Sequence, residues 1–241
     1  MNRIAVFVEG QTEQLFVAKL FREIAGRSNL QVETWKAAGP RHSRRFQSLY
    51  TDPEHPEVQY YVLVVDSSNE DSVVSDMLSQ YESLAAKGYC RILGLRDVYP
   101  ASGASAPAKL EGVLRDYVAR LLPTPAIPVE VLLAVMEIEA WFVAEHTHFG
   151  KLDPTLTCER IRKEVGFDPS KDNVENIRHP SAKLDQIYQL VGKRYTKRKA
   201  SARNTVKKLD GALLYIDVPK RAPRLLRLLK HIDAFLERDH H

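Results

Sequence analysis

Two short runs of apolar residues constrain the fold of this chain more than any other feature of its sequence. Residues 4–8 read Ile-Ala-Val-Phe-Val, and residues 60–65 read Tyr-Tyr-Val-Leu-Val-Val. Neither run alternates apolar with polar residues, so each predicts a strand that is buried on both faces of a sheet. Such strands are typical of α/β proteins. We therefore expect a Rossmann-like, mostly parallel sheet flanked by helices.

The segments around these runs continue the alternation of strand and helix that a parallel sheet needs. Residues 16–24 place apolar side chains at helical spacing before Gly26, and residues 73–86 do the same before Gly88. The remaining expectations are strands at residues 30–35, 90–95 and 129–135, a helix at residues 109–122, and loops at residues 37–56 and 101–107.

The pattern changes after residue 150. Prolines such as Pro154 and Pro180 separate short helical segments, and the strand signal disappears apart from residues 213–218. We therefore expect two parts, an α/β domain at residues 1–150 and a mainly helical C-terminal extension at residues 151–241. The final helix carries apolar residues at helical spacing, so it either packs against a core or forms the interface of a homo-oligomer.

Composition excludes several classes of protein. The chain has 241 residues, of which 44% are hydrophobic, and this is enough for a substantial core. No apolar run approaches the roughly 20 residues that a membrane span needs, and the N-terminus lacks the apolar region of a signal peptide, so we expect a cytoplasmic protein. Cys90 and Cys158 are too few for a disulfide framework or a Cys-rich zinc site. The sequence also lacks the phosphate-binding loop of nucleotide hydrolases and the nucleophile elbow of serine hydrolases.

Positive charge is concentrated in one stretch of the chain. Residues 193–208 carry eight Lys and Arg residues and no acid, although the net charge of the whole chain is only +4. The remainder of the chain is therefore acidic on balance. A run of this kind predicts a surface that binds a phosphate backbone, or more simply a solvated face. A smaller basic cluster at residues 41–45, which includes Arg44, allows the same two interpretations.

An acidic residue closes each of the two apolar runs. Glu9 comes directly after the first and Asp66 ends the second, so both carboxylates are expected at the carboxyl edge of the sheet, where open α/β sheets bind ligands. Neighbouring parallel strands lie about 4.8 Å apart, which allows two such carboxylates to share one divalent cation. Glu9 also has a simpler interpretation, as a negative charge that complements the N-terminus of the following helix.

A second acidic pair, Glu137 and Glu139, follows the strand expected at residues 129–135. Their side chains share a face only if this segment is still extended, because residues two apart lie on nearly opposite sides of a helix. In a helical segment we favour Glu139 as the functional acid. Alternatively, the segment is an amphipathic helix start whose acids stabilise its N-terminus. His146 and His148 follow, but such residues at a helix end more often contact terminal carbonyls or solvent than bind zinc.

Four short motifs resemble a known family. The segment Val8-Glu-Gly-Gln-Thr-Glu13 resembles the first motif of the Toprim metal-binding domain, and more narrowly that of a Toprim-like family of uncharacterised bacterial proteins often encoded beside ATPases in phage-defence loci. The other matches are Glu137-Ile-Glu-Ala-Trp141, Pro180-Ser-Ala-Lys-Leu184 and Tyr195-Thr-Lys197. Toprim domains usually carry Asp-x-Asp where this chain has Asp66-Ser-Ser68, so the second acid of that motif is missing.

This resemblance implies a divalent-metal-dependent nuclease that hydrolyses DNA or RNA, as an effector of anti-phage defence with an ATPase partner. It implies Mg²⁺ or Mn²⁺ as the cofactor. The expected metal ligands are Glu9, Asp66, Glu137 and Glu139. The expected catalytic residues are Glu9, Asp66, Glu139 and Lys183. The residues expected to bind nucleic acid are Lys193, Arg194, Lys197, Arg198 and Arg203. The missing acid at Ser68 leaves a second hypothesis open, a catalytically degenerate Toprim-like module that binds nucleic acid or the ATPase.

Overall fold

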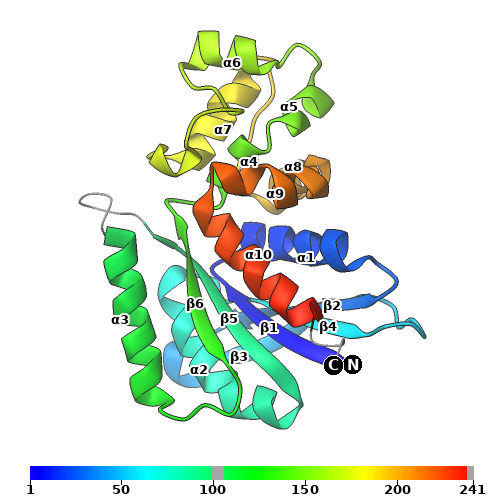
Figure 1. The fold of residues 1–241 in the computed structure, drawn as a ribbon, viewed down its shortest axis with the longest axis vertical. Coiled ribbons are helices and arrows are strands. Elements are labelled where there is room, and N and C mark those ends of the chain that lie inside the picture. The colour runs from blue at the N-terminus through cyan, green and yellow to red at the C-terminus, as the bar shows by residue number, and fades with distance from the viewer. Residues whose placement is uncertain (99–105, 238–241) are drawn as a thin grey trace. The chain divides into compact units, whose positions relative to one another are not determined.

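Six strands form one sheet within residues 1–98 and 106–237, which the computed structural model describes (Figure 1). The strands are β1 (Asn2–Val8), β2 (Leu30–Ala38), β3 (Arg45–Thr51), β4 (Tyr60–Asp66), β5 (Tyr89–Val98) and β6 (Val129–Val135). Their order across the sheet is β3-β2-β4-β1-β5-β6. The β1–β4, β1–β5 and β2–β4 pairs are parallel and β3 is antiparallel to β2, so the expected α/β fold with a mostly parallel sheet is confirmed.

β1 and β4 lie in the middle of the sheet because their side chains are apolar on both faces. Residues 4–8 have no exposed surface, and residues 62–65 are buried as well. Strand pairing places Val8 beside Asp66 on one side and beside Leu95 on the other. The carboxyl ends of β1, β4 and β5 are therefore neighbours, and the acidic residues at these ends meet at one edge of the sheet.

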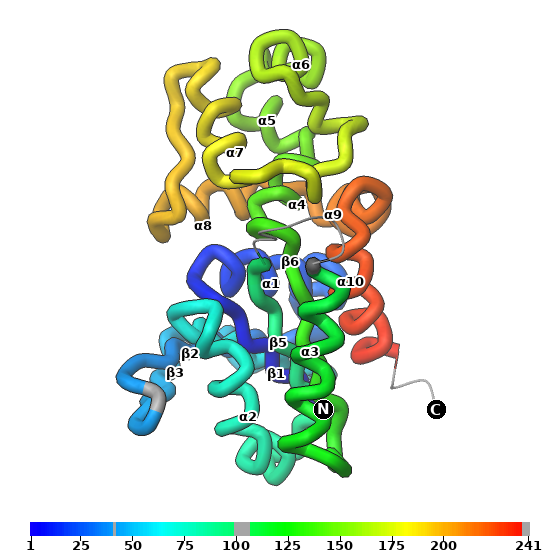
Figure 2. The backbone as a smooth tube through the Cα atoms, turned by 90° about the vertical axis from the view of Figure 1, so that its left-hand side faces the viewer, coloured from blue at the N-terminus to red at the C-terminus, as the bar shows by residue number. Residues whose placement is uncertain are grey.

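Helices cover both faces of this sheet. The helices are α1 (Gln11–Ala25), α2 (Glu70–Ala86), α3 (Ala106–Leu121) and the last turns of α10 (Pro223–Leu236). The chain crosses the sheet in one direction from β1 to β2, and in the opposite direction from β4 to β5 and from β5 to β6. Right-handed crossovers therefore place α1 on one face and α2 and α3 on the other (Figures 1 and 2). On the α1 face the Phe235 ring packs against Phe21 and Tyr60. On the other face α2 approaches β5 closely because Gly94 has no side chain: a Cβ there would lie 3.2 Å from the Val73 side chain.

The chain divides into two compact units. The first comprises Met1–Leu133 and the C-terminal segment from Lys230, and the second comprises Ala134–Leu229. This division differs from the expected domains at residues 1–150 and 151–241. The start of the helical part lies earlier because α4 (Glu139–Ala144) packs against α7 (Pro180–Gln189). The end of α10 belongs to the first unit because Phe235 packs there.

Short helices build the second unit (Figure 2). Besides α4 and α7 these are α5 (Thr147–Leu152), α6 (Cys158–Val165), α8 (Lys199–Lys208) and α9 (Gly211–Ile216), with the 3₁₀ turns η2 (Val174–Asn176) and η3 (Val218–Lys220). Its core contains Trp141, Phe142, Phe149 and Leu184, all of which are essentially inaccessible to solvent. The expected helical C-terminal part is therefore present, although its boundaries differ.

Two of the expectations drawn from the sequence are wrong. Residues 37–56 are not simply a loop, because they contain the turn η1 (Arg41–Ser43) and the edge strand β3. Most β3 side chains are exposed, so this strand lacks an apolar pattern and is held by its backbone pairing with β2. Residues 213–218 are not a strand. They belong to α9 and η3, because Asp210 caps α9 by accepting a hydrogen bond from the Leu213 N–H at 3.1 Å.

Helix starts were also predicted too late. α2 begins at Glu70 because the Asn69 side chain caps it, accepting a hydrogen bond from Ser72 N at 2.9 Å. α3 begins at Ala106, so the expected loop at residues 101–107 is shorter, and its residues 101–105 lie outside the described part of the chain. None of the described helices has both the length and the apolar character that a membrane span requires.

Candidate functional site

Glu9 lies directly after β1 and reaches towards β5. Its Oε2 accepts a hydrogen bond from the backbone N–H of Asp97 at 3.2 Å, so the carboxylate bridges the carboxyl ends of the two strands. Glu9 precedes α1, and the negative charge in the first turn of that helix comes from Glu13. Gly10 permits this arrangement, since a Cβ there would lie 3.2 Å from Glu13 Oε2. The Glu9 carboxylate therefore contacts the sheet edge from a position one residue before the N-cap of α1.

Asp66 is the last residue of β4 and is almost fully buried. Its Oδ1 accepts a hydrogen bond from Ser68 N at 2.8 Å, and its Oδ2 lies 3.9 Å from Lys36 Nζ on β2. Burial raises the pKa of Asp66 above its usual value, although the Ser68 N–H, Lys36 and Arg44 act in the opposite direction. The charge of Asp66 is thus only partly neutralised by the protein.

Ser68, two residues after Asp66, has a role in the turn after β4. Its φ of 67° is in the left-handed region, which is uncommon for a residue other than glycine. Its hydroxyl donates a hydrogen bond to the carbonyl of Ala37 at 2.8 Å, while its N–H holds Asp66. An ionised Asp has no donor for the Ala37 carbonyl. Ser68 therefore lacks the negative charge of an Asp at this position and instead stabilises the turn that fixes the Asp66 side chain.

Arg44, the residue directly before β3, stabilises the same turn. It donates hydrogen bonds to the Ser67 carbonyl at 2.7 Å and to Asp76 Oδ1 at 2.8 Å. Asp76 is almost fully buried on α2, so the pair is a charge-assisted clamp between this turn and the helix. Arg44 therefore has a structural partner, whereas the sequence placed it only in a basic cluster.

The edge pair, by which we mean Glu9 and Asp66, occupies neighbouring strand ends. Val8 and Asp66 are register partners, and Ser67 N donates to Val8 O at 2.9 Å. The two carboxylates contact different neighbours, Glu9 towards β5 and Asp66 towards its own turn and β2. Within residues 1–98 and 106–237 no three His, Cys, Asp or Glu side chains are grouped as ligands of one metal ion.

The second acidic pair is brought together by a sharp turn after β6. Met136 has a φ of 67°, and Glu139 is the first residue of α4, so the segment is neither extended nor helical throughout. Lys197 Nζ lies 3.0 Å from Glu137 Oε1 and 3.5 Å from Glu139 Oε2. Tyr195 donates its hydroxyl hydrogen to Glu139 Oε1 at 2.7 Å. We call these four residues, Glu137, Glu139, Tyr195 and Lys197, the Lys197 network.

The two acids of this network have different electrostatics. Burial favours a higher pKa for Glu137, but the Ser181 N–H, which donates at 2.7 Å, and the charge of Lys197 outweigh it, so the pKa of Glu137 is lowered. Burial dominates at Glu139, which has 0% exposed surface, and its pKa is raised despite Lys197 and Tyr195. Glu137 is thus the ionised partner of Lys197, and Glu139 is the acid held in an apolar environment.

Residues from three separate segments of the chain meet in this network. Glu137 and Glu139 supply the carboxylates, Ser181 supplies the N–H at the start of α7, and Tyr195 and Lys197 supply the hydroxyl and the ammonium. Glu137 and Glu139 belong to the second unit, so their convergence with the edge pair stays a prediction.

Asp185 was missed from the sequence. It lies one helical turn after Ser181 and accepts hydrogen bonds from Tyr195 N at 2.8 Å and Arg194 Nε at 2.9 Å, which orients the network's loop. Its partners, Arg194 and Tyr195, lie nine and ten residues further along the chain, and the sequence alone gave no signal for these contacts.

The basic segment at residues 193–208 separates into paired and unpaired cations. Lys193 donates to the Leu152 carbonyl, Arg194 pairs with Asp185, and Lys197 is bound to its two acids. Lys199, Arg203 and Lys207 are exposed and recur every four residues along α8, so they share one face of that helix. In the described part of the chain no acidic side chain pairs with these three residues, which we call the α8 stripe, or with Arg198, the residue that precedes α8.

Lys183 and His148 are placed by other contacts. Lys183 Nζ donates to Gln186 Oε1 at 3.2 Å and faces a cavity beside α7. His148 is fully buried, lies 4.1 Å from Phe149 between ring centres, and has its Nδ1 3.5 Å from Glu145 Oε2. It lies in the first turn of α5, and its Nδ1 contacts the carbonyl oxygen of Glu145, the C-cap of α4, so the expected contact with a terminal carbonyl at a helix end is confirmed, although the side chain is buried and not exposed.

Comparisons with known proteins add little to this geometry. No protein-family profile and no curated protein matches the chain. Among solved structures, a match is found to a Lactobacillus plantarum WCFS1 protein that its name proposes to be a cell surface hydrolase, with 9% identity and a TM-score of 0.30. That match covers 56% of this chain and about half, 53%, of the other. So distant a likeness says nothing about activity.

Proposed function

We propose that this chain is a Mg²⁺- or Mn²⁺-dependent nuclease whose metal is held by Glu9 and Asp66. The observation that carries the proposal is the register of the sheet, which sets an acidic residue at each of two adjacent carboxyl ends, with Val8 beside Asp66. The resemblance of residues 8–13 to the first Toprim motif supports it. Ligands of open α/β sheets bind at this edge.

The residue types of the edge pair suit a hard divalent cation. The two carboxylates contact Asp97 N on one side and Ser68 N and Lys36 on the other, so they would have to turn towards each other to share one ion. Mg²⁺ keeps several waters and is usually held by only one or two carboxylates together with substrate phosphates, so two carboxylates are sufficient. The raised pKa of Asp66 indicates a carboxylate that the protein does not fully neutralise, and a bound cation would favour its ionised form. Glu137 and Glu139 are less suited to this role, because Lys197 already lies between their carboxylates.

In this proposal each group of residues has a distinct task. When bound, the metal ion supplies a Lewis acid that neutralises the scissile phosphate and lowers the pKa of a coordinated water. Ser68 and Arg44 hold Asp66 and its turn in a fixed orientation. The α8 stripe and Arg198 bind the phosphate backbone, and the Lys197 network fixes the loop that leads to α8. The resemblance further proposes an ATPase partner and a role in anti-phage defence.

A nuclease assay tests this proposal. The purified chain is incubated with labelled single-stranded DNA, duplex DNA and RNA, in Mg²⁺, in Mn²⁺ and in EDTA. We expect cleavage of at least one substrate with metal, none in EDTA, and at least about a 100-fold loss in Glu9→Gln and in Asp66→Asn. Asp116→Asn is the matched control, because Asp116 is exposed on α3 and pairs only with Arg115 at 3.7 Å. Equal cleavage by all four proteins, or cleavage in EDTA, would refute the proposal.

The second candidate function is a module that binds nucleic acid or the ATPase without cleaving. Ser68 in place of the second acid favours it, as does the absence of a three-residue ligand group within the described residues. This candidate predicts that the wild-type chain binds the same substrates and leaves them intact in Mg²⁺ and Mn²⁺, and that neither ion raises its melting temperature.

A further inference from the structure

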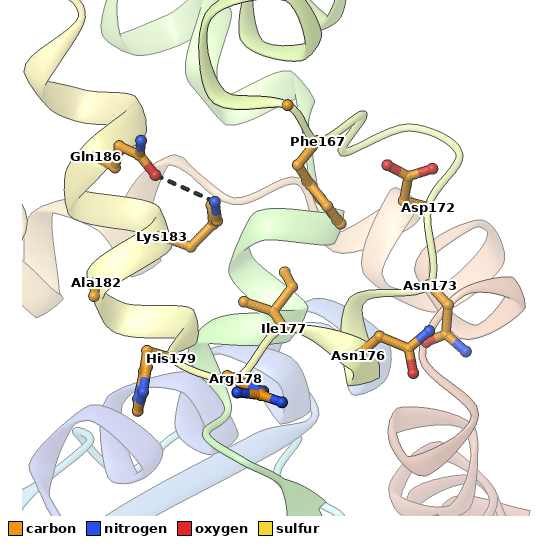
Figure 3. A pocket seen from close by; sticks show the side chains of 11 residues that line it. Phe167, Asp172, Asn173, Asn176, Ile177, Arg178, His179, Ala182, Lys183 and Gln186 are labelled. Atoms are coloured by element: carbon orange, nitrogen blue, oxygen red, sulfur yellow. Dashed lines mark hydrogen bonds between the residues drawn. The ribbon is translucent and has the colours of Figure 1, made fainter.

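A cavity of about 670 Å³ lies in the second unit beside α7, and no residue of the Lys197 network lines it (Figure 3). One wall is α7, which contributes Lys183 and Gln186. The opposite wall is the loop after α6, which contributes Phe167, and the floor is the segment after η2, which contributes Ile177 and Arg178. Its volume is within the roughly 300–1,000 Å³ of pockets that hold small molecules.

The side chains of this cavity combine three kinds of recognition. Phe167 is half-buried and presents its ring to the hollow, with Ile177 beside it (Figure 3). Lys183 extends from α7 towards the same space, and Arg178 is exposed, with no acidic partner in residues 1–98 and 106–237. Asn176 adds an exposed amide, which can donate and accept hydrogen bonds.

Charge in the cavity favours an anion. Arg178 and Lys183 are cationic, and the one acid in the lining, Asp172, has its Oδ2 turned to the backbone N–H of Asp168 at 2.8 Å. An aromatic face next to cations and an amide matches a planar, heteroaromatic ligand that carries a phosphate. A phosphate alone would not contact the ring of Phe167, and an apolar ligand would leave Arg178 without an acidic partner among the described residues and Lys183 with Gln186 alone.

We propose that this cavity binds a nucleoside phosphate, with its base stacked on Phe167 and its phosphate between Lys183 and Arg178. Bases stack on aromatic side chains with little dependence on sequence, and Lys and Arg bind phosphate oxygens. The nucleoside phosphate is either an unpaired nucleotide of a nucleic-acid strand or a free mononucleotide. Binding of a strand nucleotide rests on the proposed function, because it makes the cavity part of the nuclease's substrate site. Binding of a free mononucleotide does not rest on it.

Calorimetric titration of the full chain in EDTA tests the proposal without any cleavage. The probes are AMP, UMP, ribose 5-phosphate and inorganic phosphate. We expect both nucleotides to bind, and ribose 5-phosphate and phosphate to bind at least about tenfold more weakly, because they lack a base to stack. Phe167→Leu, which keeps an apolar side chain, and Lys183→Gln should each weaken nucleotide binding by about tenfold or more.

Lys163→Gln is the matched control, since Lys163 is exposed on α6 and does not line the cavity. Melting temperatures of the variants show that they are folded. The proposal is overturned if neither nucleotide binds, if ribose 5-phosphate binds as well as AMP, or if Phe167→Leu and Lys183→Gln bind nucleotides like wild type while folded.

Two further measurements separate the sources and the hypotheses. Displacement of AMP by a single-stranded oligonucleotide supports the strand nucleotide, and AMP binding that the oligonucleotide does not affect supports the free mononucleotide. Glu9→Gln and Asp66→Asn should bind AMP like wild type. Loss of nucleotide binding in the pocket variants is the expected result and refutes neither proposal. A chain that cleaves nucleic acid but binds no nucleotide refutes the nucleotide-binding proposal and leaves the nuclease proposal standing.

Discussion

The two acidic pairs of this protein follow strands in the same way, yet their surroundings differ. Glu137 and Glu139 share the ammonium of Lys197, and Glu137 also accepts a hydrogen bond from Ser181 N. In the edge pair, Glu9 accepts a backbone N–H, and the nearest cation to Asp66 in the structure, Lys36, is 3.9 Å away. A cation of the protein, Lys197, thus lies between Glu137 and Glu139, whereas backbone N–H groups hold Glu9 and Asp66 in place.

The pKa shifts separate Glu137 from Asp66, whereas burial raises the pKa of Glu139 as it does that of Asp66. The pKa of Glu137 is lowered, because Ser181 and Lys197 outweigh the effect of burial, whereas the pKa of Asp66 is raised, because burial outweighs Ser68 and Lys36. A carboxylate that costs folding energy and has few protein partners is typical of functional sites. The comparison therefore supports the proposal that the edge pair, and not the Lys197 network, binds a cation.

The largest expected effect concerns the α8 stripe, whose three cations have no acidic partner among the described residues. Replacing all three residues of the α8 stripe with Gln should weaken binding of duplex DNA by about 100-fold near physiological salt, and reduce the slope of log affinity against log salt by about 2.7, or about 0.9 per lost phosphate contact. Fluorescence anisotropy across a salt series measures both quantities.

The matched control removes the same charge from exposed positions of the first unit, Arg27, Lys109 and Arg120. If that triple variant changes the salt slope as much as the stripe variant does, binding follows net charge and α8 is not the contact surface. A stripe variant with an unchanged slope would show that these side chains touch no phosphate.

The next effect is on folding. Lys197→Ala should lower the free energy of unfolding by about 2 kcal/mol, because it leaves two buried carboxylates without their cation; the value is below that of a fully buried pair because the Lys197 side chain is 43% exposed. Lys199→Ala, on the same segment but without an acidic partner, should stay within about 0.5 kcal/mol of wild type. Urea unfolding measures both.

The pH dependence of this effect has a defined sign. Because the folded state lowers the pKa of Glu137 below its ordinary 4.5, the stability that its charge contributes is complete above about pH 4.5 and is lost as the pH falls through the folded value. Lys197 also lowers the pKa of Glu139, which burial raises above 4.5, so the deficit of Lys197→Ala should begin to shrink above pH 4.5, where Glu139 takes up a proton, and shrink further as the pH falls through the folded value of Glu137. A deficit independent of pH would mean that Lys197 acts through packing alone.

The smallest effect distinguishes the edge pair. In EDTA at pH 7, Asp66→Asn should be as stable as wild type or up to about 1 kcal/mol more stable, because the folded state raises the pKa of Asp66 and so penalises its charge. The amide oxygen still accepts from Ser68 N. The advantage should disappear as the pH falls towards 3.8, the ordinary pKa, since the wild-type carboxyl group is then protonated too.

Asp52→Asn serves as the opposite control in the same unit. Asp52 pairs with Arg22 at 2.9 Å and accepts a hydrogen bond from Val32 N, so its replacement should destabilise the fold by about 1 kcal/mol. If Asp66→Asn loses as much stability as this control, Asp66 is a structural partner of Lys36 and Arg44, and the contrast between the two pairs fails.

Sequence reasoning succeeded where burial leaves a clear pattern. β1 and β4 were located because residues 4–8 and 60–65 are apolar on both faces, and the positions of Glu9 and Asp66 at strand ends follow from that. β3 was missed because an edge strand with exposed side chains is specified by backbone pairing with β2. Residues 213–218 were assigned to a strand because Leu, Tyr, Ile and Val are also common in strands, and the cap at Asp210 decided the outcome.

Partners of the acidic residues were harder to predict than their positions. The pairing of Lys197 with Glu137 and Glu139 joins residues from two distant parts of the chain, and a single sequence holds no signal for such a contact. The turn at Met136, whose positive φ lets both acids reach one cation, also contains no glycine that would have marked it. Charge alone therefore assigned Lys197 to nucleic acid, while the structure gives it a protein partner.

The most direct test of the contrast is the stabilisation that Mg²⁺ gives to three proteins. Melting temperatures of wild type, Asp66→Asn and Glu137→Gln are measured in EDTA and across a Mg²⁺ titration, because a bound ion at about 100 times its Kd adds about 2.7 kcal/mol of stability. We predict that Mg²⁺ stabilises wild type and Glu137→Gln to the same extent and has no effect on Asp66→Asn. Stabilisation that persists in Asp66→Asn, or that disappears in Glu137→Gln, would contradict the assignment of the metal to the edge pair.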